Sequence, residues 1–181
     1  MVLPPIKFCT ACGSPVEEKI PVDDDHIRSV CTDCGNVHYI NPKMVVGCIP
    51  ELEGQILLCK RNIEPQKGRW TLPAGFLEDK ESVQDGALRE TREETRARVE
   101  IIAPYRLFNI AFVSQVYFMF RAKLVTTDFG PTSESTEVRL FDEKEIPWDD
   151  IAFRVIRQTL EHYFEDRRTT GQYHFRIFDI K

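Results

Sequence analysis

The 181-residue chain lacks any apolar run close to the roughly 18 residues that a membrane-spanning helix needs. It also lacks an excess of positive charge, since its formal net charge is −5 at pH 7. A general nucleic-acid-binding protein needs a basic face to displace counterions, so this balance argues against nucleic acid as a partner and leaves open only a local basic pocket. With 42% hydrophobic and 29% charged residues, and no internal repeats or low-complexity segments, the composition predicts a globular protein.

The first residues, MVLPPIKFCTAC, lack the charged and then apolar layout of a signal peptide, and no long Ser- and Arg-rich segment precedes the first cysteine. We therefore expect a cytoplasmic protein with no membrane partner. Because disulfides are rare in the reducing cytoplasm, the six cysteines are interpreted first as metal ligands or buried thiols.

Four of the cysteines form two C-x-x-C pairs, Cys9 with Cys12 and Cys31 with Cys34, separated by 18 residues. This spacing is typical of a four-cysteine zinc ribbon, in which two tight knuckles share one tetrahedral Zn²⁺ ion. Two disulfides or a redox C-x-x-C are the alternatives. Because cysteine would fill all four coordination positions, the ion would be structural, and it would stabilise a module too small to fold on its own core.

Apolar segments beyond the ribbon predict strands joined by polar turns, with one helix in the middle and one near the end. Cys48 and Cys59 lie in two of the apolar runs and are expected to be buried thiols. A turn at Glu53 and Gly54 joins the first two strands, and Ser82 caps the first helix. The predicted strands cover residues 44–50, 55–61, 70–72, 99–112, 114–125 and 138–142, and the predicted helices cover residues 82–97 and 149–166. This mixture indicates an α/β or α+β fold with a mixed sheet.

The first predicted helix carries three glutamates, Glu90, Glu93 and Glu94, on one face. Like charges at i,i+3 and i,i+4 cost an isolated helix roughly a few tenths of a kcal/mol each. A solvent-exposed helix with the ion pairs Arg89–Glu93 and Glu94–Arg98 is the simpler interpretation, but it does not explain why three carboxylates converge. A divalent cation would explain it, because Mg²⁺ prefers oxygen ligands and is held by one or two carboxylates together with substrate phosphates.

These glutamates belong to a longer pattern with fixed spacing: Gly75, five residues, Glu81, seven residues, Arg89-Glu90, two residues and Glu93-Glu94. In this pattern the sequence resembles the Nudix hydrolases. Two positions depart from the family's box. Thr91 stands where an aliphatic residue is usual, and Arg96 stands where a glycine ordinarily ends the helix in a left-handed conformation. The departures put the end of the helix in question and leave the carboxylates in place.

The resemblance implies a Nudix-type α/β/α sandwich with a mixed sheet. It also implies hydrolysis of a nucleoside diphosphate linked to another group, with Mg²⁺ or Mn²⁺ as cofactor. Arg89 looks like an orienting partner of the glutamates. The metal ligands implied are principally Glu90 and Glu94, with Glu93, Glu81 in a supporting position and the Ala74 carbonyl.

A general base and the substrate contacts must be sought partly outside the box. In related enzymes the base is a glutamate of the box or of a downstream loop, which makes Glu134 and Glu137 candidates. Each is at least as well explained as a solvated loop carboxylate. Arg61 is either a phosphate ligand or a surface cation. An adenine or flavin ring would need an aromatic shelf, although core packing explains each candidate better; the candidates are Phe76, Phe108 and Phe112.

Two Nudix groups join a four-cysteine ribbon to the box. NADH pyrophosphatases carry a Ser-Gln-Pro-Trp-Pro-Phe-Pro element, and the corresponding region here, FNIAFVSQVYFMF, lacks it. The segments INPKMVVGCIPE, LLCKRNIEP, GRWTLPAGFLE, AKL and VRLF resemble the plant FAD pyrophosphatase group, which is also active on ADP-ribose. We therefore expect hydrolysis of FAD or ADP-ribose to AMP plus FMN or ribose 5-phosphate. The alternatives are NADH hydrolysis and a non-catalytic nucleotide-sensing module whose ribbon binds RNA or protein.

The predicted domains are a zinc ribbon at residues 1–40, a Nudix hydrolase domain at residues 41–168 and a C-terminal tail at residues 169–181. The tail is strand-like and has no obvious partner in the chain. It is either an added edge strand or, as we expect, a subunit contact. Similar enzymes are often homodimers, so a homodimer is the expected assembly.

Overall fold

The computed structural model describes residues 5–181, and the chain divides into two compact units between Pro42 and Lys43. The predicted ribbon begins at residue 1, and its residues 1–4 lie outside the described part. Each unit is considered by itself. Within residues 5–181, no helix is both long enough and apolar enough to span a membrane.

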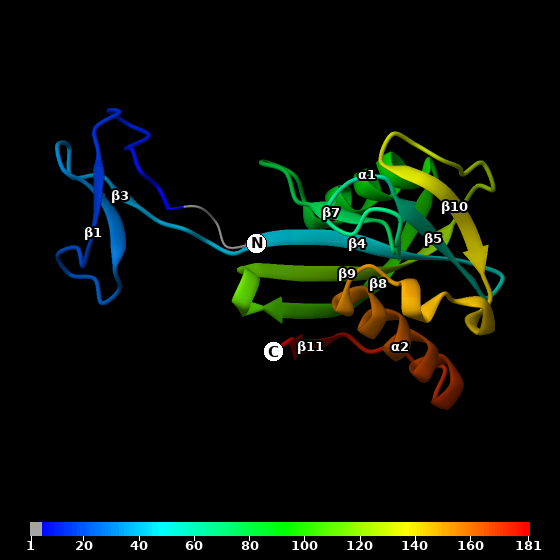
Figure 1. Ribbon diagram of the computed structural model, residues 1–181. Coiled ribbons are helices and arrows are strands. Elements are labelled where there is room, and N and C mark those ends of the chain that lie inside the picture. Colours follow the sequence, from blue (N-terminus) through cyan, green and yellow to red (C-terminus); the bar gives the residue numbers. More distant parts are fainter. Residues whose placement is uncertain (1–4) are drawn as a thin grey trace. The chain divides into compact units, whose positions relative to one another are not determined.

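The first unit is a three-stranded antiparallel sheet in the order β1-β2-β3, drawn in blue in Figure 1. β1 (Val16–Lys19) pairs with β2 (Arg28–Cys31), and β2 pairs with β3 (Val37–His38). Among its described residues, the buried apolar side chains are Cys9, Val30 and Cys31. So small a set gives this unit almost no hydrophobic core of its own.

The second unit is built around a mixed sheet with the strand order β10-β5-β4-β9-β8-β11 (Figure 1). The central strand β4 pairs antiparallel with β5 and parallel with β9, which confirms the predicted mixed sheet. Two short strands lie off this path, β6 on β5 and β7 on β4. The strand bounds are β4 Lys43–Leu52, β5 Gln55–Arg61, β6 Trp70–Thr71, β7 Ala74–Phe76, β8 Val99–Ile110, β9 Gln115–Leu124, β10 Ser135–Phe141 and β11 Arg176–Asp179.

The two helices of the second unit pack against opposite faces of this sheet. Successive side chains of a strand point to opposite faces, so one central strand contributes to both cores. Val46 and Cys48 of β4 share a buried cluster with Ala87 of α1 (Val83–Thr95). Ile49 of β4 belongs to a second cluster with Leu160 of α2 (Arg154–Thr169). Figure 1 shows α1 and α2 on the two sides of the sheet, which confirms the expected α/β/α sandwich.

Two segments differ from the elements that the sequence predicts. β7 is not predicted, because its Pro- and Gly-rich surroundings are typical of a loop, yet it pairs antiparallel with β4. The second helix is expected from residue 149, but a 3-10 turn occupies Trp148–Asp150 and α2 begins only at Arg154. The predicted turn between the first two strands does form, with Glu53 and Gly54 both at positive φ.

The C-terminal tail forms an edge strand, since β11 pairs in parallel with β8. Behind it, Arg106 of β8 is only 1% exposed, and its guanidinium donates to the His174 carbonyl at 2.6 Å and to the Asp166 carboxylate at 2.8 Å. A buried arginine thus ties the tail to β8 and α2. The tail therefore has a partner within the chain, contrary to the expectation from sequence, and its subunit contact stays a prediction.

Candidate active site

The charged helix α1 is capped at both ends. The Ser82 hydroxyl accepts a hydrogen bond from the Asp85 backbone N–H at 3.1 Å, as expected of an N-cap residue. At the other end Arg96 adopts a left-handed conformation, with φ 62° and ψ −8°, and its N–H donates to the Arg92 carbonyl at 2.8 Å. Arg96 therefore takes the conformation that glycine usually supplies at a helix end, so the departure from the box does not displace the end of the helix.

Two glycines allow the loop before α1 to come close to its neighbours. A Cβ on Gly47 of β4 would collide with Ala74 of β7. A Cβ on Gly75 would collide with the carboxylate of Glu90, which reaches across from α1. Because neither glycine has a side chain, β7 can lie against β4 and the Glu90 carboxylate can lie against β7.

Glu94 is the one acidic residue that is buried within residues 5–181, at 5% exposure. Its carboxylate accepts a hydrogen bond from the Ala74 N–H at 3.0 Å, and the Cys59 thiol donates to it at 3.8 Å. Burial raises the pKa of Glu94 to about 8; the Ala74 N–H opposes this shift, and the negative charge of Glu90 adds to it. The ion pair of Glu94 with Arg98 that the sequence suggests does not form, because the chain leaves the helix between them.

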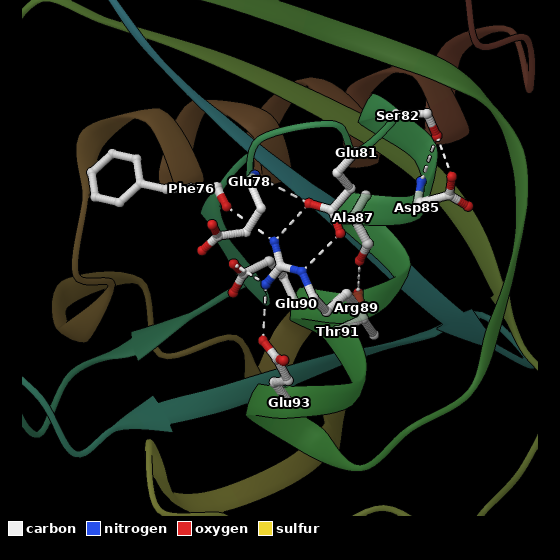
Figure 2. A network of polar contacts seen from close by, with 10 residues as sticks. All are labelled: Phe76, Glu78, Glu81, Ser82, Asp85, Ala87, Arg89, Glu90, Thr91 and Glu93. Carbon is white, nitrogen blue, oxygen red and sulfur yellow. Dashed lines mark hydrogen bonds and ion pairs between the residues drawn. The ribbon is translucent and has the colours of Figure 1, made fainter.

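Arg89 joins three other carboxylates into one network, which Figure 2 shows at close range. Its guanidinium donates to Glu81 at 2.8 and 2.9 Å, to Glu90 at 2.7 Å, to Glu93 at 2.9 Å and to the Phe76 carbonyl at 3.1 Å. Hydrogen bonds from this arginine lower the pKa of Glu81. Burial raises the pKa of Glu90 even though the same arginine opposes the shift. The box residues are therefore brought together, with Arg89 oriented toward Glu90.

Of the two downstream candidates for a base, Glu134 lies near the carboxylates. Its negative charge raises the pKa of both Glu90 and Glu94. Glu137 instead pairs with Lys60 at 2.7 Å. The residue before Lys60 in β5 faces Glu94, and side chains alternate along a strand, so Lys60 and Glu137 lie on the other face. This position does not support Glu137 as the base.

Arg61 lies beside the carboxylates rather than on the surface. It is 9% exposed, and its positive charge lowers the pKa of Glu94. Its Nε donates to the Pro65 carbonyl at 2.9 Å, and its guanidinium lies 5.0 Å from the centre of the Phe153 ring. The surface-cation alternative is therefore wrong for Arg61.

The three aromatic candidates fall into two classes. Phe108 is fully buried and belongs to the core. Phe76 and Phe112 are 46% and 64% exposed, so core packing does not account for them. Phe76 directly follows Gly75 in β7, and its carbonyl accepts a hydrogen bond from Arg89. The Phe76 ring is therefore accessible, but it points away from the carboxylates in Figure 2 and lies 5.1 Å from the Lys43 ammonium.

The four predicted zinc ligands lie together in the first unit. Their Sγ–Sγ distances are 3.4 Å for Cys12 and Cys31, 3.5 Å for Cys12 and Cys34, and 3.7 Å for Cys9 and Cys34. A tetrahedral ion with Zn–S bonds of about 2.3 Å would hold its sulfur atoms about 3.8 Å apart, so these spacings fit one ion. All six cysteines of the chain are free, which excludes the two-disulfide alternative.

Comparison with known families assigns both units. The family model of the NUDIX domain matches residues 41–162, and the Nudix N-terminal model, a zinc ribbon, matches residues 7–40. The chain belongs to the Nudix family. The Nudix match includes the loop, α1 and the glutamates described above.

Similar Nudix proteins include one solved structure of nearly the same extent. The crystal structure of a NUDIX hydrolase from Nitrosomonas europaea is 53% identical, with a TM-score of 0.93 over 97% of this chain and 99% of that chain. The NAD-capped RNA hydrolase NudC of Vibrio parahaemolyticus is 29% identical over 168 residues, which are 89% of this chain and 62% of the relative. The ADP-ribose pyrophosphatase of Methanocaldococcus jannaschii is 44% identical over 57 residues, which are 32% of this chain and 34% of the relative. The chain thus spans less than two thirds of the length of either curated relative.

These relatives change two expectations. The long matches are to NudC proteins rather than specifically to the plant FAD pyrophosphatase group. Those relatives are named NAD-capped RNA hydrolases, so the argument from net charge against nucleic acid as a partner is not supported. The mean charge of a chain says little about one local surface.

Nudix enzymes use divalent cations, and the donor set of this site fits one. The carboxylates do not form a ready-made cage: within residues 5–181, the clusters with at least three potential ligands close together are the four cysteines and the group Asp24, Asp25 and His26. A hard cation needs only one or two protein carboxylates when waters and substrate phosphates supply the rest. The raised pKa values of Glu90 and Glu94 reflect first burial and then the negative charges of neighbouring glutamates, and a bound cation would offset both effects.

We predict that zinc removal unfolds the ribbon of this Nudix protein and leaves the second unit folded. Apart from the cysteines, Val30 is the one buried apolar side chain among the described ribbon residues, while Val22 is 92% exposed. The ion must therefore supply most of the stability, and structural zinc contributes roughly 10 kcal/mol or more in comparable modules. Hydrogen exchange should show loss of protection confined to residues 5–42 in a Cys31→Ser variant, with zinc content falling to zero. A Cys48→Ala variant is the control and should keep one zinc per chain. Protected ribbon amides without bound zinc would contradict the prediction.

Proposed function

We propose that this Nudix protein hydrolyses the pyrophosphate bond of a nicotinamide adenine dinucleotide unit, with Mg²⁺ or Mn²⁺ as cofactor. The observation that carries the proposal is the packing of the buried Glu94 and the partly buried Glu90 against the loop at Ala74 and Gly75, where the charge of Glu90 raises the pKa of Glu94. A cation bound there would neutralise phosphate oxygens and lower the pKa of an attacking water. A pyrophosphate otherwise resists attack because its own negative charge repels a nucleophile.

The box residues have distinct proposed roles. Glu81 is proposed to act through Arg89, because its carboxylate accepts two hydrogen bonds from the guanidinium and so fixes the direction of that group. Arg89 in turn orients Glu90, to which it donates at 2.7 Å. The proposed ligands of the cation are Glu90 and Glu94, with Glu93 and the Ala74 carbonyl completing the site.

Residues outside the box complete the proposal. Glu134 is the proposed general base, since it is exposed and its charge acts on both principal ligands. Arg61 is proposed to balance the charge of Glu94 and to bind a substrate phosphate, because its Nε donates to the Pro65 carbonyl and leaves its two terminal NH2 groups as donors. Phe76 is proposed to stack on an aromatic ring of the substrate, for which its exposed face is suited.

The choice of substrate rests on similarity. The NAD-capped RNA hydrolases align with nearly the whole chain, ribbon included, which favours an NAD unit over FAD or ADP-ribose. FAD and ADP-ribose are the second candidates, because an ADP-ribose pyrophosphatase shares 44% identity over a shorter stretch and because the chain lacks the Ser-Gln-Pro-Trp-Pro-Phe-Pro element. A non-catalytic sensor is disfavoured by the full set of carboxylates. The homodimer and the cytoplasmic location remain predictions.

We expect AMP to be released when the protein is incubated with NADH and Mg²⁺, and to be released faster than from FAD or ADP-ribose at equal concentration. Chromatographic detection of AMP over a substrate series gives kcat/KM for each compound. A clear preference for FAD or ADP-ribose would replace the NAD unit by the second candidates. Failure to release AMP from any of the three, with either Mg²⁺ or Mn²⁺, would exclude the proposed hydrolysis.

A further inference from the structure

A second feature of the Nudix unit lies at the C-terminal end of α1. A surface pocket of about 430 Å³ is lined by Arg92, Arg96, Arg98, Thr126 and Asp128. Three of these five residues are arginines, in a chain whose net charge is −5. Three positive charges around one pocket need a physical explanation, because like charges close to one another repel.

None of the three guanidinium groups has a hydrogen-bond or ion-pair partner within residues 5–181, although Asp128 lines the same pocket. Arg89, three residues before Arg92 on the same helix, shows the opposite behaviour and bonds to three glutamates. The pocket arginines are therefore not there to neutralise nearby carboxylates.

Capping of the helix does not explain them either. The Arg92 and Thr95 carbonyls accept backbone N–H groups from Arg96 and Gly130, at 2.8 and 2.9 Å. The Glu94 carbonyl accepts the Thr132 hydroxyl at 3.4 Å. Three of the four carbonyls of the last turn are therefore already satisfied, so capping does not occupy the three guanidinium groups.

Arg96 occupies a position that would suit glycine better. Its φ of 62° lies in the left-handed region, where a side chain is sterically unfavourable and glycine is not. An arginine is nevertheless present at this position, and it lines the same pocket as Arg92 and Arg98. The unfavourable backbone conformation of Arg96, the three guanidinium groups without partners and their position around one pocket together indicate a binding site for an anion.

We propose that this pocket binds phosphate groups, and that their source is the RNA chain that continues from a nucleotide held at the carboxylate site. The planar fork of a guanidinium matches the oxygens of a phosphate, and the Thr126 hydroxyl is a further donor in the pocket. Arg92 directly precedes Glu93, and Arg96 follows it by three residues, so the pocket lies within about one helical turn of the box. The RNA source rests on the proposed function and on relatives named NAD-capped RNA hydrolases, whereas the anion site rests on the arginines alone.

The test compares two variants that lose the same charge. The pocket variant combines Arg92→Gln, Arg96→Gly and Arg98→Gln, with glycine chosen at residue 96 because it fits the left-handed conformation. The control variant combines Lys144→Gln, Arg168→Gln and Arg176→Gln, which are exposed positions outside α1. Binding of a short fluorescein-labelled single-stranded RNA is measured by anisotropy at several salt concentrations, without a divalent cation, so that no hydrolysis is needed.

We expect the pocket variant to bind this RNA at least tenfold more weakly than the unmodified protein. The slope of log K against log salt should fall by about 2, since each lost phosphate contact to a single strand removes about 0.7. The control variant should keep affinity and slope. Equal losses in the two variants would overturn the inference, and so would unchanged binding in the pocket variant. Inorganic phosphate is added as a competitor at a concentration equal to that of the phosphate groups of the RNA. If it displaces the RNA, the pocket binds small anions and the proposal that it binds an RNA chain is wrong.

Hydrolysis of NADH separates this inference from the proposed function. The pocket variant should keep NADH kcat/KM within about twofold, because NADH has no chain that extends to the pocket. A loss of NADH turnover as large as the loss of RNA binding would place the arginines in the pyrophosphate site and overturn the inference. If the unmodified protein binds RNA through the arginines but hydrolyses no dinucleotide, the proposed function fails while the anion site stands.

Discussion

Replacing Glu94 by glutamine is expected to lower kcat for AMP release by about a thousandfold, the equivalent of roughly 4 kcal/mol of transition-state stabilisation. The proposed ligand loses its negative charge while its shape is unchanged. A neutral amide binds a hard divalent cation far less well than a carboxylate, so saturation with Mg²⁺ should also require a much higher concentration. Steady-state kinetics over a Mg²⁺ series measures both effects.

The fold of the Glu94→Gln variant should survive, which makes the kinetic result interpretable. The glutamine oxygen can still accept the Ala74 N–H that the carboxylate accepts at 3.0 Å. Burial raises the pKa of Glu94 to about 8, so the cation-free protein already favours a neutral group at this position near pH 7. The melting temperature without a divalent cation should therefore stay the same or rise slightly.

A matched control shows whether the loss is specific to the site. Glu161→Gln makes the same chemical change on α2, where the carboxylate is half exposed and pairs with Arg157 at 2.9 Å. This variant should keep full activity, because an exposed i,i+4 pair contributes only about 0.3–0.5 kcal/mol to stability. A Glu94→Gln enzyme with more than about a tenth of normal kcat would show that Glu94 is not a principal ligand.

The sequence predicts the box well because its information is local. Glu90, Glu93 and Glu94 are placed by helical periodicity, and Ser82 marks the start of that helix by its capping chemistry. Long apolar and β-branched runs likewise locate the main strands. These signals depend on neighbours within a few residues, so they can be read without knowing the fold.

The sequence does not predict features that depend on contacts between residues far apart in the chain. β7 has the composition of a loop and becomes a strand only because β4 lies beside it, with Gly47 leaving the space. The burial of Arg106 depends on Asp166 of α2 and His174 of the tail, which lie 60 and 68 residues further along the chain. Glu134 and Glu137 look equivalent in the sequence, and the pairing of Glu137 with Lys60 is what separates them. The sequence does mark Arg96 as unusual, because it stands where the family has a glycine. The proposed role of Arg96 in anion binding follows only from the pocket that it lines.

The second large effect is expected from Gly75→Ala, which adds one methyl group to the loop facing α1. The new Cβ would occupy the place of the Glu90 carboxylate. That carboxylate is the end of a flexible side chain, so it would swing away rather than force the backbone to move. It would then lose its 2.7 Å hydrogen bond from Arg89 and its proposed position at the cation. Since a displacement of about 1 Å in a catalytic constellation can cost about a hundredfold in rate, we expect kcat to fall by about that factor.

The stability of this variant distinguishes a displaced ligand from a disrupted fold. Loss of one charge-assisted hydrogen bond predicts a decrease of about 1–3 kcal/mol in the free energy of unfolding, well short of global unfolding for a typical domain. Gly130→Ala is the matched control, because a Cβ there meets only the Arg96 guanidinium, at an ordinary contact distance of 3.9 Å. It should keep activity toward NADH. Urea titration and kinetics on the two alanine variants make the comparison, and a fully active Gly75→Ala protein would mean that Glu90 does not need its observed position. The expected loss of activity would instead place the glycine of the box in the catalytic site as much as the glutamates, because its missing side chain leaves the space for the Glu90 carboxylate.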